Sequence, residues 1–140
     1  MKRKITKRHL TLSAGSFATF HLFASWNDWY RSSMAWVDIP IHFLGGVLMA
    51  AIFYWFFHKH PNYFDVDRNF WVTLAFVMGW VALTGVAWEF TEYLNDILVN
   101  SYNFSLNILQ FGLKDTLGDL LSDLTGGLAL TVLMRLKYHK

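Results

Sequence analysis

Three stretches of this sequence are apolar over about the length that crosses a lipid bilayer. They span residues 38–57, 70–94 and 116–134, and a membrane-spanning helix needs about 20 mostly apolar residues. Of the 140 residues, 54% are hydrophobic, 19% aromatic and only 16% charged. A soluble domain of this size could not bury so much apolar surface. The sequence therefore predicts an all-α membrane protein.

A fourth stretch, residues 10–27, is less apolar and contains Ser, Thr and His21. It follows the basic leader MKRKITKR, so two interpretations compete: a cleaved secretory signal or a first membrane helix. The stretch lacks a convincing small-x-small cleavage site before the Trp-rich segment 26–36. This favours the membrane helix.

The positions of Lys and Arg distinguish three spans from four. With four spans and a cytoplasmic N-terminus, ten of these residues lie inside, and only Arg31 and Lys114 lie outside. With three spans the division is seven against five, so the positive-inside rule favours four. We therefore predict a polytopic bundle of four transmembrane helices with both termini cytoplasmic. It forms one integral membrane domain, residues 1–140, with helices at about 10–27, 38–57, 70–96 and 115–136.

Acidic residues gather at one end of the last three predicted helices, and their spacings of three and four place them on one face of each helix. In the predicted topology this end is the outer one. The set comprises Asp38 and His42 on the second helix, Glu89, Glu92 and Asp96 on the third, and Asp115, Asp119 and Asp123 on the fourth. One histidine and seven carboxylates should therefore meet near the outer face.

The negative charge of this group must be compensated, because insertion of one acidic side chain at the centre of a membrane helix costs about 2.5–3.5 kcal/mol. Either several carboxyl groups are protonated, or a cation lies among them. Mixed histidine and carboxylate ligands suit zinc, manganese or iron, and all-oxygen ligands suit magnesium or calcium. We predict a divalent metal site (Zn, Mn or Mg) with His42 or Glu89 as general base. Its predicted ligands are Asp38, His42, Glu89, Glu92, Asp115, Asp119 and Asp123.

Simpler roles are open for several of these residues. Asp38, just before Pro40, and Asp115 could each cap the start of a helix. Asp96 could be a solvated helix end, and the others could form an internal hydrogen-bond network. His21 could be a packed or pore-facing histidine. Segment 97–113 mixes apolar and Asn residues and could be an interfacial or re-entrant helix.

The order DIPIHFLGG, WEFTEYLND and LKDTLGDLLSDLTGG resembles small bacterial membrane proteins of the VanZ-like and YjdF-like families, over about residues 36–130. Those families carry Asp-x3-His at the start of one helix, a Glu motif at the end of the next, and Asp-x3-Asp or Asp-x3-Asn with glycines in the last. Asn is usual in VanZ-like proteins where Asp123 stands, and Gln near Glu92, so the chain looks closer to the YjdF-like branch. The resemblance implies the same seven site residues and a multi-pass inner-membrane location, but no known reaction.

Three functions are open. The first is an outward-opening, membrane-embedded cation site that carries out hydrolysis or transfer on a lipid-linked or envelope substrate. The second is proton or metal-ion transport, which needs a path to both faces, although the inner halves of the helices are nearly devoid of polar groups. The third is a non-catalytic membrane subunit with a structural polar network.

The expected partner is the lipid bilayer, and a homo-oligomer is open. Basic and aromatic residues are not interleaved as a nucleic-acid site would need, so no nucleic-acid partner is expected. The absence of cysteine excludes a thiolate nucleophile, and no glycine-rich phosphate loop is present.

Overall fold

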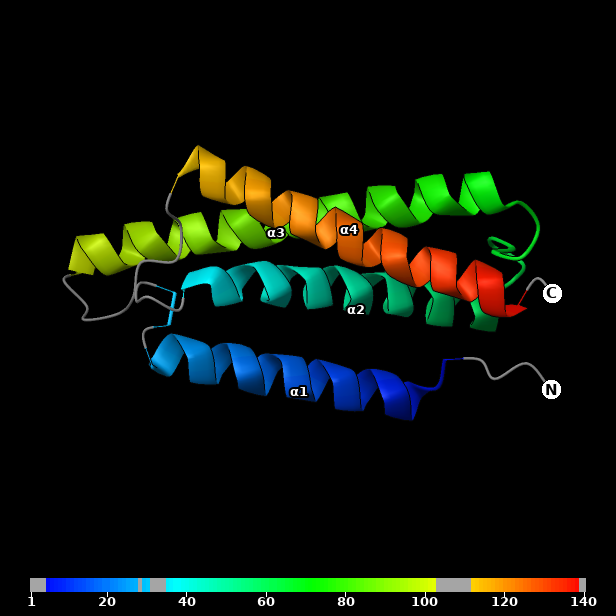
Figure 1. The fold of residues 1–140 in the computed structure, drawn as a ribbon, viewed down its shortest axis with the longest axis horizontal. Helices are drawn as coiled ribbons and strands as arrows, with labels where there is room; N and C mark the ends of the chain where they lie inside the picture. The colour runs from blue at the N-terminus through cyan, green and yellow to red at the C-terminus, as the bar shows by residue number, and fades with distance from the viewer. Residues whose placement is uncertain (1–4, 28, 31–34, 103–111, 139–140) are drawn as a thin grey trace.

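The computed structural model describes residues 5–27, 29–30, 35–102 and 112–138. Its regular elements are all helical, as the sequence predicts (Figure 1). They are α1 (Lys7–Trp26), the short 3-10 helix η1 (Ala35–Val37), α2 (Asp38–Lys59), α3 (Phe70–Tyr102) and α4 (Leu113–Tyr138).

Short polar side chains start two of the helices. The Thr6 hydroxyl accepts a hydrogen bond from the backbone N–H of His9 (3.2 Å) at the start of α1. The Asn69 side chain accepts from the N–H groups of Trp71 (3.0 Å) and Val72 (3.2 Å) at the start of α3. Such caps satisfy N–H groups that have no partner within the helix.

Helix α2 is at the centre of the bundle (Figure 1). α1 lies along one side of it, and α3 and α4 lie on the other, where α4 crosses α3. The most extensive contact is between α2 and α4. The start of α1, the α2–α3 connection and the end of α4 share one end of the bundle (Figure 1). Described basic residues at that end are Lys7, Arg8, Lys59, Arg68, Arg135 and Lys137.

Three helices are long and apolar enough to cross a membrane by length and composition: Asp38–Lys59, Phe70–Leu98 and Leu113–Lys137. Large apolar side chains on their outer faces are exposed, including Trp71, Leu83 and Phe90 of α3. The four-helix, all-α prediction is confirmed as a fold. α1 is not one of the three, so its passage through the membrane, and with it the four-span topology, stays a prediction.

The predicted helix bounds hold to within a few residues except at the end of α3. Residues 97–102 continue that helix to Tyr102, six residues beyond the predicted end at residue 96, so a separate helix does not begin at residue 97. The physical reason is that ILVNSY contains no Gly or Pro to end the helix. Residues 103–111 lie outside the described residues. Gly112 then adopts a positive φ of 104° just before α4.

Two glycines bring the backbones of α2 and α4 into direct contact. A Cβ atom added to Gly46 of α2 would collide with the backbone carbonyl of Asp123. A Cβ atom added to Gly126 of α4 would collide with the carbonyl of Phe43. Small residues permit this close approach of membrane helices, and here the approach brings the acidic face of α4 next to that of α2.

Two apolar clusters hold the bundle at its two ends. One joins α2, α3 and α4 towards the α2–α3 connection, around Phe53, Val77 and Val81. The other joins α1 to the start of α2, around Ala24 and Ile41. Asp38 and His42 alternate at the start of α2 with Val37 and Ile41 of the second cluster, so the predicted acidic site lies at that end of the bundle.

We expect Gly126→Ala to destabilise the protein, because the new methyl group needs α2 and α4 to separate. Overpacking of this kind costs about 1–3 kcal/mol, measured here as a fall in the thermal unfolding midpoint in mild detergent, followed by circular dichroism. Gly118→Ala on the same helix is the control, since nothing lies within 4 Å of the added Cβ. It should be neutral or stabilise by up to about 1 kcal/mol, because alanine favours the helix over glycine. Equal midpoints for the two variants would contradict the direct α2–α4 contact.

Candidate functional site

Six ionisable side chains from three helices converge between α2, α3 and α4. We call them the acid–histidine cluster: Asp38 and His42 of α2, Glu89 and Glu92 of α3, and Asp119 and Asp123 of α4. Five are buried, and Asp38 is half-buried. The structure thus brings together six of the seven residues that the sequence suggests as ligands.

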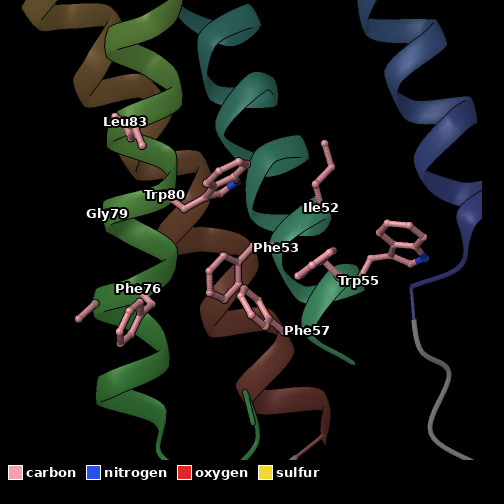
Figure 2. Close-up of a pocket in the computed structure, with 10 residues that line it drawn as sticks. Ile52, Phe53, Trp55, Phe57, Phe76, Gly79, Trp80 and Leu83 are labelled. Atoms are coloured by element: carbon pink, nitrogen blue, oxygen red, sulfur yellow. The ribbon is translucent and has the colours of Figure 1, made fainter. Parts of the chain in front are cut away.

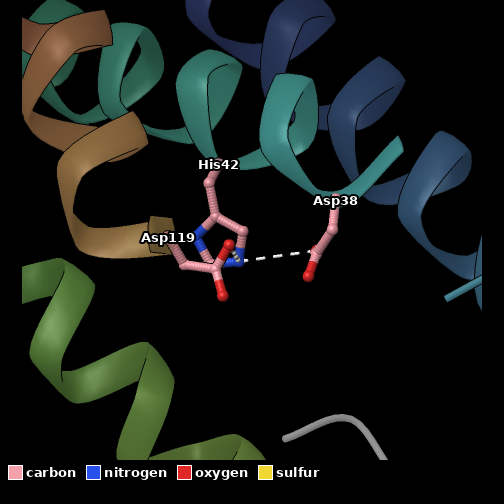
Figure 3. Close-up of side chains that lie close together, drawn as sticks. All are labelled: Asp38, His42 and Asp119. Atoms are coloured by element: carbon pink, nitrogen blue, oxygen red, sulfur yellow. Dashed lines mark ion pairs between the residues drawn. The ribbon is translucent and has the colours of Figure 1, made fainter. Parts of the chain in front are cut away.

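His42 is the centre of the cluster. Its Nε2 lies 3.6 Å from Oδ1 of Asp38 and 3.9 Å from Oδ1 of Asp119 (Figure 3). Its Nδ1 lies 3.4 Å from Oδ2 of Asp123. Both ring nitrogens therefore face carboxylate groups, one nitrogen towards two of them and the other towards a third.

Two groups of three donors meet at His42. One is Asp38, His42 and Asp119, and the other is His42, Glu89 and Glu92; within each, one ligand atom per residue lies within 4.8 Å of the others. Ligands about 2.1 Å from a tetrahedral zinc ion are about 3.4 Å from one another. The distances from His42 Nε2 to Asp38 and Asp119 exceed this value by only a few tenths of an ångström. Small side-chain movements would bring these atoms to the spacing of metal ligands.

The start of α2 explains why Asp38 joins the cluster. The N-cap of α2 is Val37, which makes no side-chain cap hydrogen bond, and Asp38 is the first helical residue. Its carboxylate lies on the His42 side, one turn away. The helix-capping interpretation of Asp38 is therefore not what the structure shows.

Three glycines pack against Asp123, and two of them leave room for its carboxylate. A Cβ atom on Gly85 of α3 would lie 2.7 Å from its Oδ2, and one on Gly45 of α2 would lie 3.4 Å from its Oδ1. Gly46 contacts its backbone on the same side. Asp123 is thus enclosed between α2 and α3, with the same Oδ2 atom directed to His42.

Two acidic residues from the sequence analysis lie outside the acid–histidine cluster. Asp115 is in the first turn of α4, half-buried and within electrostatic range of Asp38 and Asp119. Asp96 is buried and lies inside α3, which continues for six more residues, so it is not a solvated helix end. The Asn95 side chain donates a 3.5 Å hydrogen bond to it.

Two aromatic residues that the sequence analysis did not assign to the site contact its edge. The indole Nε1 of Trp88 donates a 2.9 Å hydrogen bond to Oε1 of Glu92. The Trp88 ring also meets the His21 ring edge to face, with 5.2 Å between centroids. The spacing of four between Trp88 and Glu92 could have indicated this pair, whereas Trp88 alone looked like a lipid-facing residue.

Tyr30 carries the second contact, from the connection between α1 and α2. Its hydroxyl lies 2.7 Å from Nδ1 of His21. Burial, and beyond it the carboxylates of Asp38 and Glu92, raise the pKa of the Tyr30 phenol above its ordinary value. The phenol is protonated at neutral pH, and its O–H can donate a hydrogen bond to Nδ1 of His21. His21 thus belongs to the edge of the site rather than to the donor groups.

Comparison with known proteins identifies a family. The model of the family described as "Predicted membrane protein (DUF2238)" matches residues 4–140, so the chain belongs to that family. An uncharacterised protein of Thermotoga maritima is 28% identical over 124 residues, which are 89% of this chain and 60% of that protein. The chain thus spans about 60% of the length of this relative, and no solved structure matches. These matches support a membrane protein family, and the finer VanZ-like or YjdF-like resemblance stays a prediction.

Proposed function

We propose that this member of the DUF2238 family binds a divalent cation in the acid–histidine cluster. We further propose that the cation serves hydrolysis or transfer on a lipid-linked or envelope substrate. The observation that supports the proposal is the pair of three-donor groups that share His42. The family description supports the membrane setting and gives no reaction.

The ligands we favour are Asp38, Asp119 and Nε2 of His42, because the two carboxylates already face this nitrogen. Asp123 then has a different task from the one its position in the sequence suggested. It faces the other ring nitrogen, where it can accept the Nδ1 proton and hold the imidazole in orientation. Carboxylates in this role are usual behind metal-bound histidines. Zinc, manganese and magnesium all suit this mixture of donors.

The charge of the cluster also favours a cation. Five carboxyl groups surround one imidazole, and α2 and α3 carry no Lys or Arg before Lys59 or within residues 70–102. Ionised groups taken out of water need partners, because desolvation costs several kcal/mol per ion. A divalent cation would supply two positive charges where the side chains offer at most one.

Glu89 is the residue we favour as general base. It is buried within one of the donor groups, whereas both ring nitrogens of His42 already face carboxylates. A bound cation would polarise a phosphoryl or carbonyl oxygen and acidify a bound water. Glu89 would take the proton from the attacking water or hydroxyl, which general-base catalysis requires to be within hydrogen-bond reach.

The proposed setting is the inner membrane, with the basic end of the bundle cytoplasmic and the cluster open to the outer face. Six described Lys and Arg residues share the end of the bundle that is remote from the cluster. This arrangement supports the predicted orientation, with both termini inside. α1 would be the fourth span.

Transport is the less supported function. Below the cluster, residues 43–57, 70–88 and 124–134 contain no Asp, Glu, His, Lys or Arg. Buried polar groups in the described part of this region include the hydroxyls of Tyr54, Thr73 and Thr131. A path for ions to the other face would need more polar groups than these. A structural network of protonated carboxyl groups is the alternative that the next experiment addresses.

Metal content tests the site. We expect protein purified in mild detergent without chelator to retain about one divalent metal ion per chain, measured by plasma mass spectrometry. Asp119→Asn and His42→Ala should each lose it, because each removes a donor of the favoured group. Asp65→Asn, in the exposed α2–α3 connection, should retain it. Metal at background level in wild-type protein that is folded would refute the cation site and favour the protonated network.

The orienting role of Asp123 has its own test. A methyl group at Gly85 would displace the Asp123 carboxylate, because the added Cβ would lie 2.7 Å from the same Oδ2 atom that faces His42. Gly85→Ala should therefore lower metal affinity by about 10–100-fold, as loss of such partners does. Gly79→Ala is the control on the same helix, since nothing lies within 4 Å of its added Cβ. Manganese titration followed by electron paramagnetic resonance gives both affinities. Equal affinities would mean that Asp123 does not position His42.

A further inference from the structure

Two apolar cavities lie in line along the groove between α2 and α3. The upper one, nearer the acid–histidine cluster, has a volume of about 210 Å³. It touches His42 and Asp123 and is otherwise lined mainly by apolar residues of α1, α2 and α3. The lower one, of about 690 Å³, is lined by apolar side chains and Gly79, from Ile52 to Phe57 on α2 and from Ala75 to Leu83 on α3 (Figure 2). Together they follow the groove from the acid–histidine cluster towards the basic end of the bundle.

The side chain of Trp80 separates the two cavities. It extends from α3 towards α2 above Phe53 (Figure 2), and its Nε1 donates a 3.1 Å hydrogen bond to the backbone carbonyl of Met49. Met49 lines the upper cavity, and Trp80 lines the lower one.

The dimensions of the groove fit a hydrocarbon chain. The upper cavity is larger than the apolar cavity of about 150 Å³ that accommodates benzene in an engineered protein. From Gly45 to Phe57 the groove follows thirteen residues of α2, and the twelve steps of 1.5 Å between them give about 18 Å. Half of the hydrocarbon core of a bilayer is about 15 Å thick, so one lipid chain extends over a similar length.

We propose that the α2–α3 groove binds one acyl chain of a phospholipid whose phosphate group lies at the acid–histidine cluster. The proposal rests on the proposed function for the phosphate, because the carboxylates would repel an anion unless a cation lies between them. It names the substrate class of that site: a phospholipid held by its chain below and by its phosphate above.

The contact of the upper cavity with the cluster distinguishes this groove from the rest of the lipid-facing surface. Every apolar face of a membrane helix meets acyl chains, but the upper cavity of this groove reaches the buried side chains of His42, a favoured ligand, and Asp123, which orients it. A site that is mostly apolar with a few convergent polar groups is the usual form of a small-molecule site. A second copy of the chain is a poorer occupant, because the upper cavity is too small for a helix about 10 Å wide.

Photolabelling tests the acyl chain directly. The wild-type protein is reconstituted in vesicles of phosphatidylethanolamine and phosphatidylglycerol that contain a phosphatidylglycerol with a diazirine at the end of one acyl chain. After irradiation, labelled positions are mapped by peptide mass spectrometry. We expect labels to concentrate on groove residues such as Phe53, Phe76 and Trp80, several-fold above exposed positions such as Leu12 and Trp71.

Gly79→Leu should reduce this labelling about fivefold or more, because the side chain fills the lower cavity where nothing lies within 4 Å of the added Cβ. Gly15→Leu is the matched control: it also enters open space, but on α1, in a hollow away from the groove. It should leave the labelling unchanged. Gly79→Ala should give an intermediate loss and replaces the leucine variant if that variant does not fold.

Labelling spread evenly over lipid-facing positions, or unchanged by Gly79→Leu, would overturn the proposal. A dimer in detergent that Gly79→Leu dissociates, without groove labelling, would overturn it in favour of a second copy of the chain. The metal content of the same samples distinguishes failure of the acyl-chain site from failure of the cation site. Metal without groove labelling supports the cation site and refutes the acyl-chain site. Groove labelling without metal retains the acyl-chain site but refutes the cation, and with it the position of the phosphate at the cluster.

Discussion

The bundle depends on how it accommodates acidic side chains in an apolar interior. Five carboxyl groups surround His42 between α2, α3 and α4, and the imidazole is the only basic side chain among them. Each ionised group that leaves water costs several kcal/mol unless it is paired. The cluster must therefore hold protons, a cation or both, and this requirement is the main physical constraint on the interior of the bundle.

The close contact of α2 with α4 is the device that builds the cluster. Gly46 and Gly126 allow the two backbones to touch, and this contact places Asp119 and Asp123 on either side of the His42 ring. Gly85 then leaves the space that the Asp123 carboxylate occupies. The glycines at these positions thus determine where the side chains of the cluster lie as well as how the helices pack. The helix crossing and the geometry around His42 have one common cause.

Much of this arrangement follows from the sequence. Apolar length predicts α2, α3 and α4 closely, and spacings of three and four place Asp38 with His42 and Asp119 with Asp123 on shared faces. The predicted end of α3, residue 96, was six residues too early. The Asn residues near it suggested an interruption, whereas the absence of Gly and Pro lets the helix continue. The contact of Tyr30 with His21 could not be predicted, because it depends on how an irregular connection folds back over the helices. The sequence could not show that Asp119 faces Nε2 of His42 while Asp123 faces Nδ1, because spacing along a helix does not give distances to single atoms of a neighbouring helix.

The central claim is that a divalent cation binds beside His42. Manganese(II) added to the metal-free protein in mild detergent tests it most directly, by pulsed electron paramagnetic resonance. We expect about one tightly bound ion per chain whose spectrum shows coupling to one imidazole nitrogen, lost in His42→Gln. Manganese that stays in its hydrated form, or that binds with no nitrogen coupling, would contradict the account. The cluster would then be a network of protonated carboxyl groups.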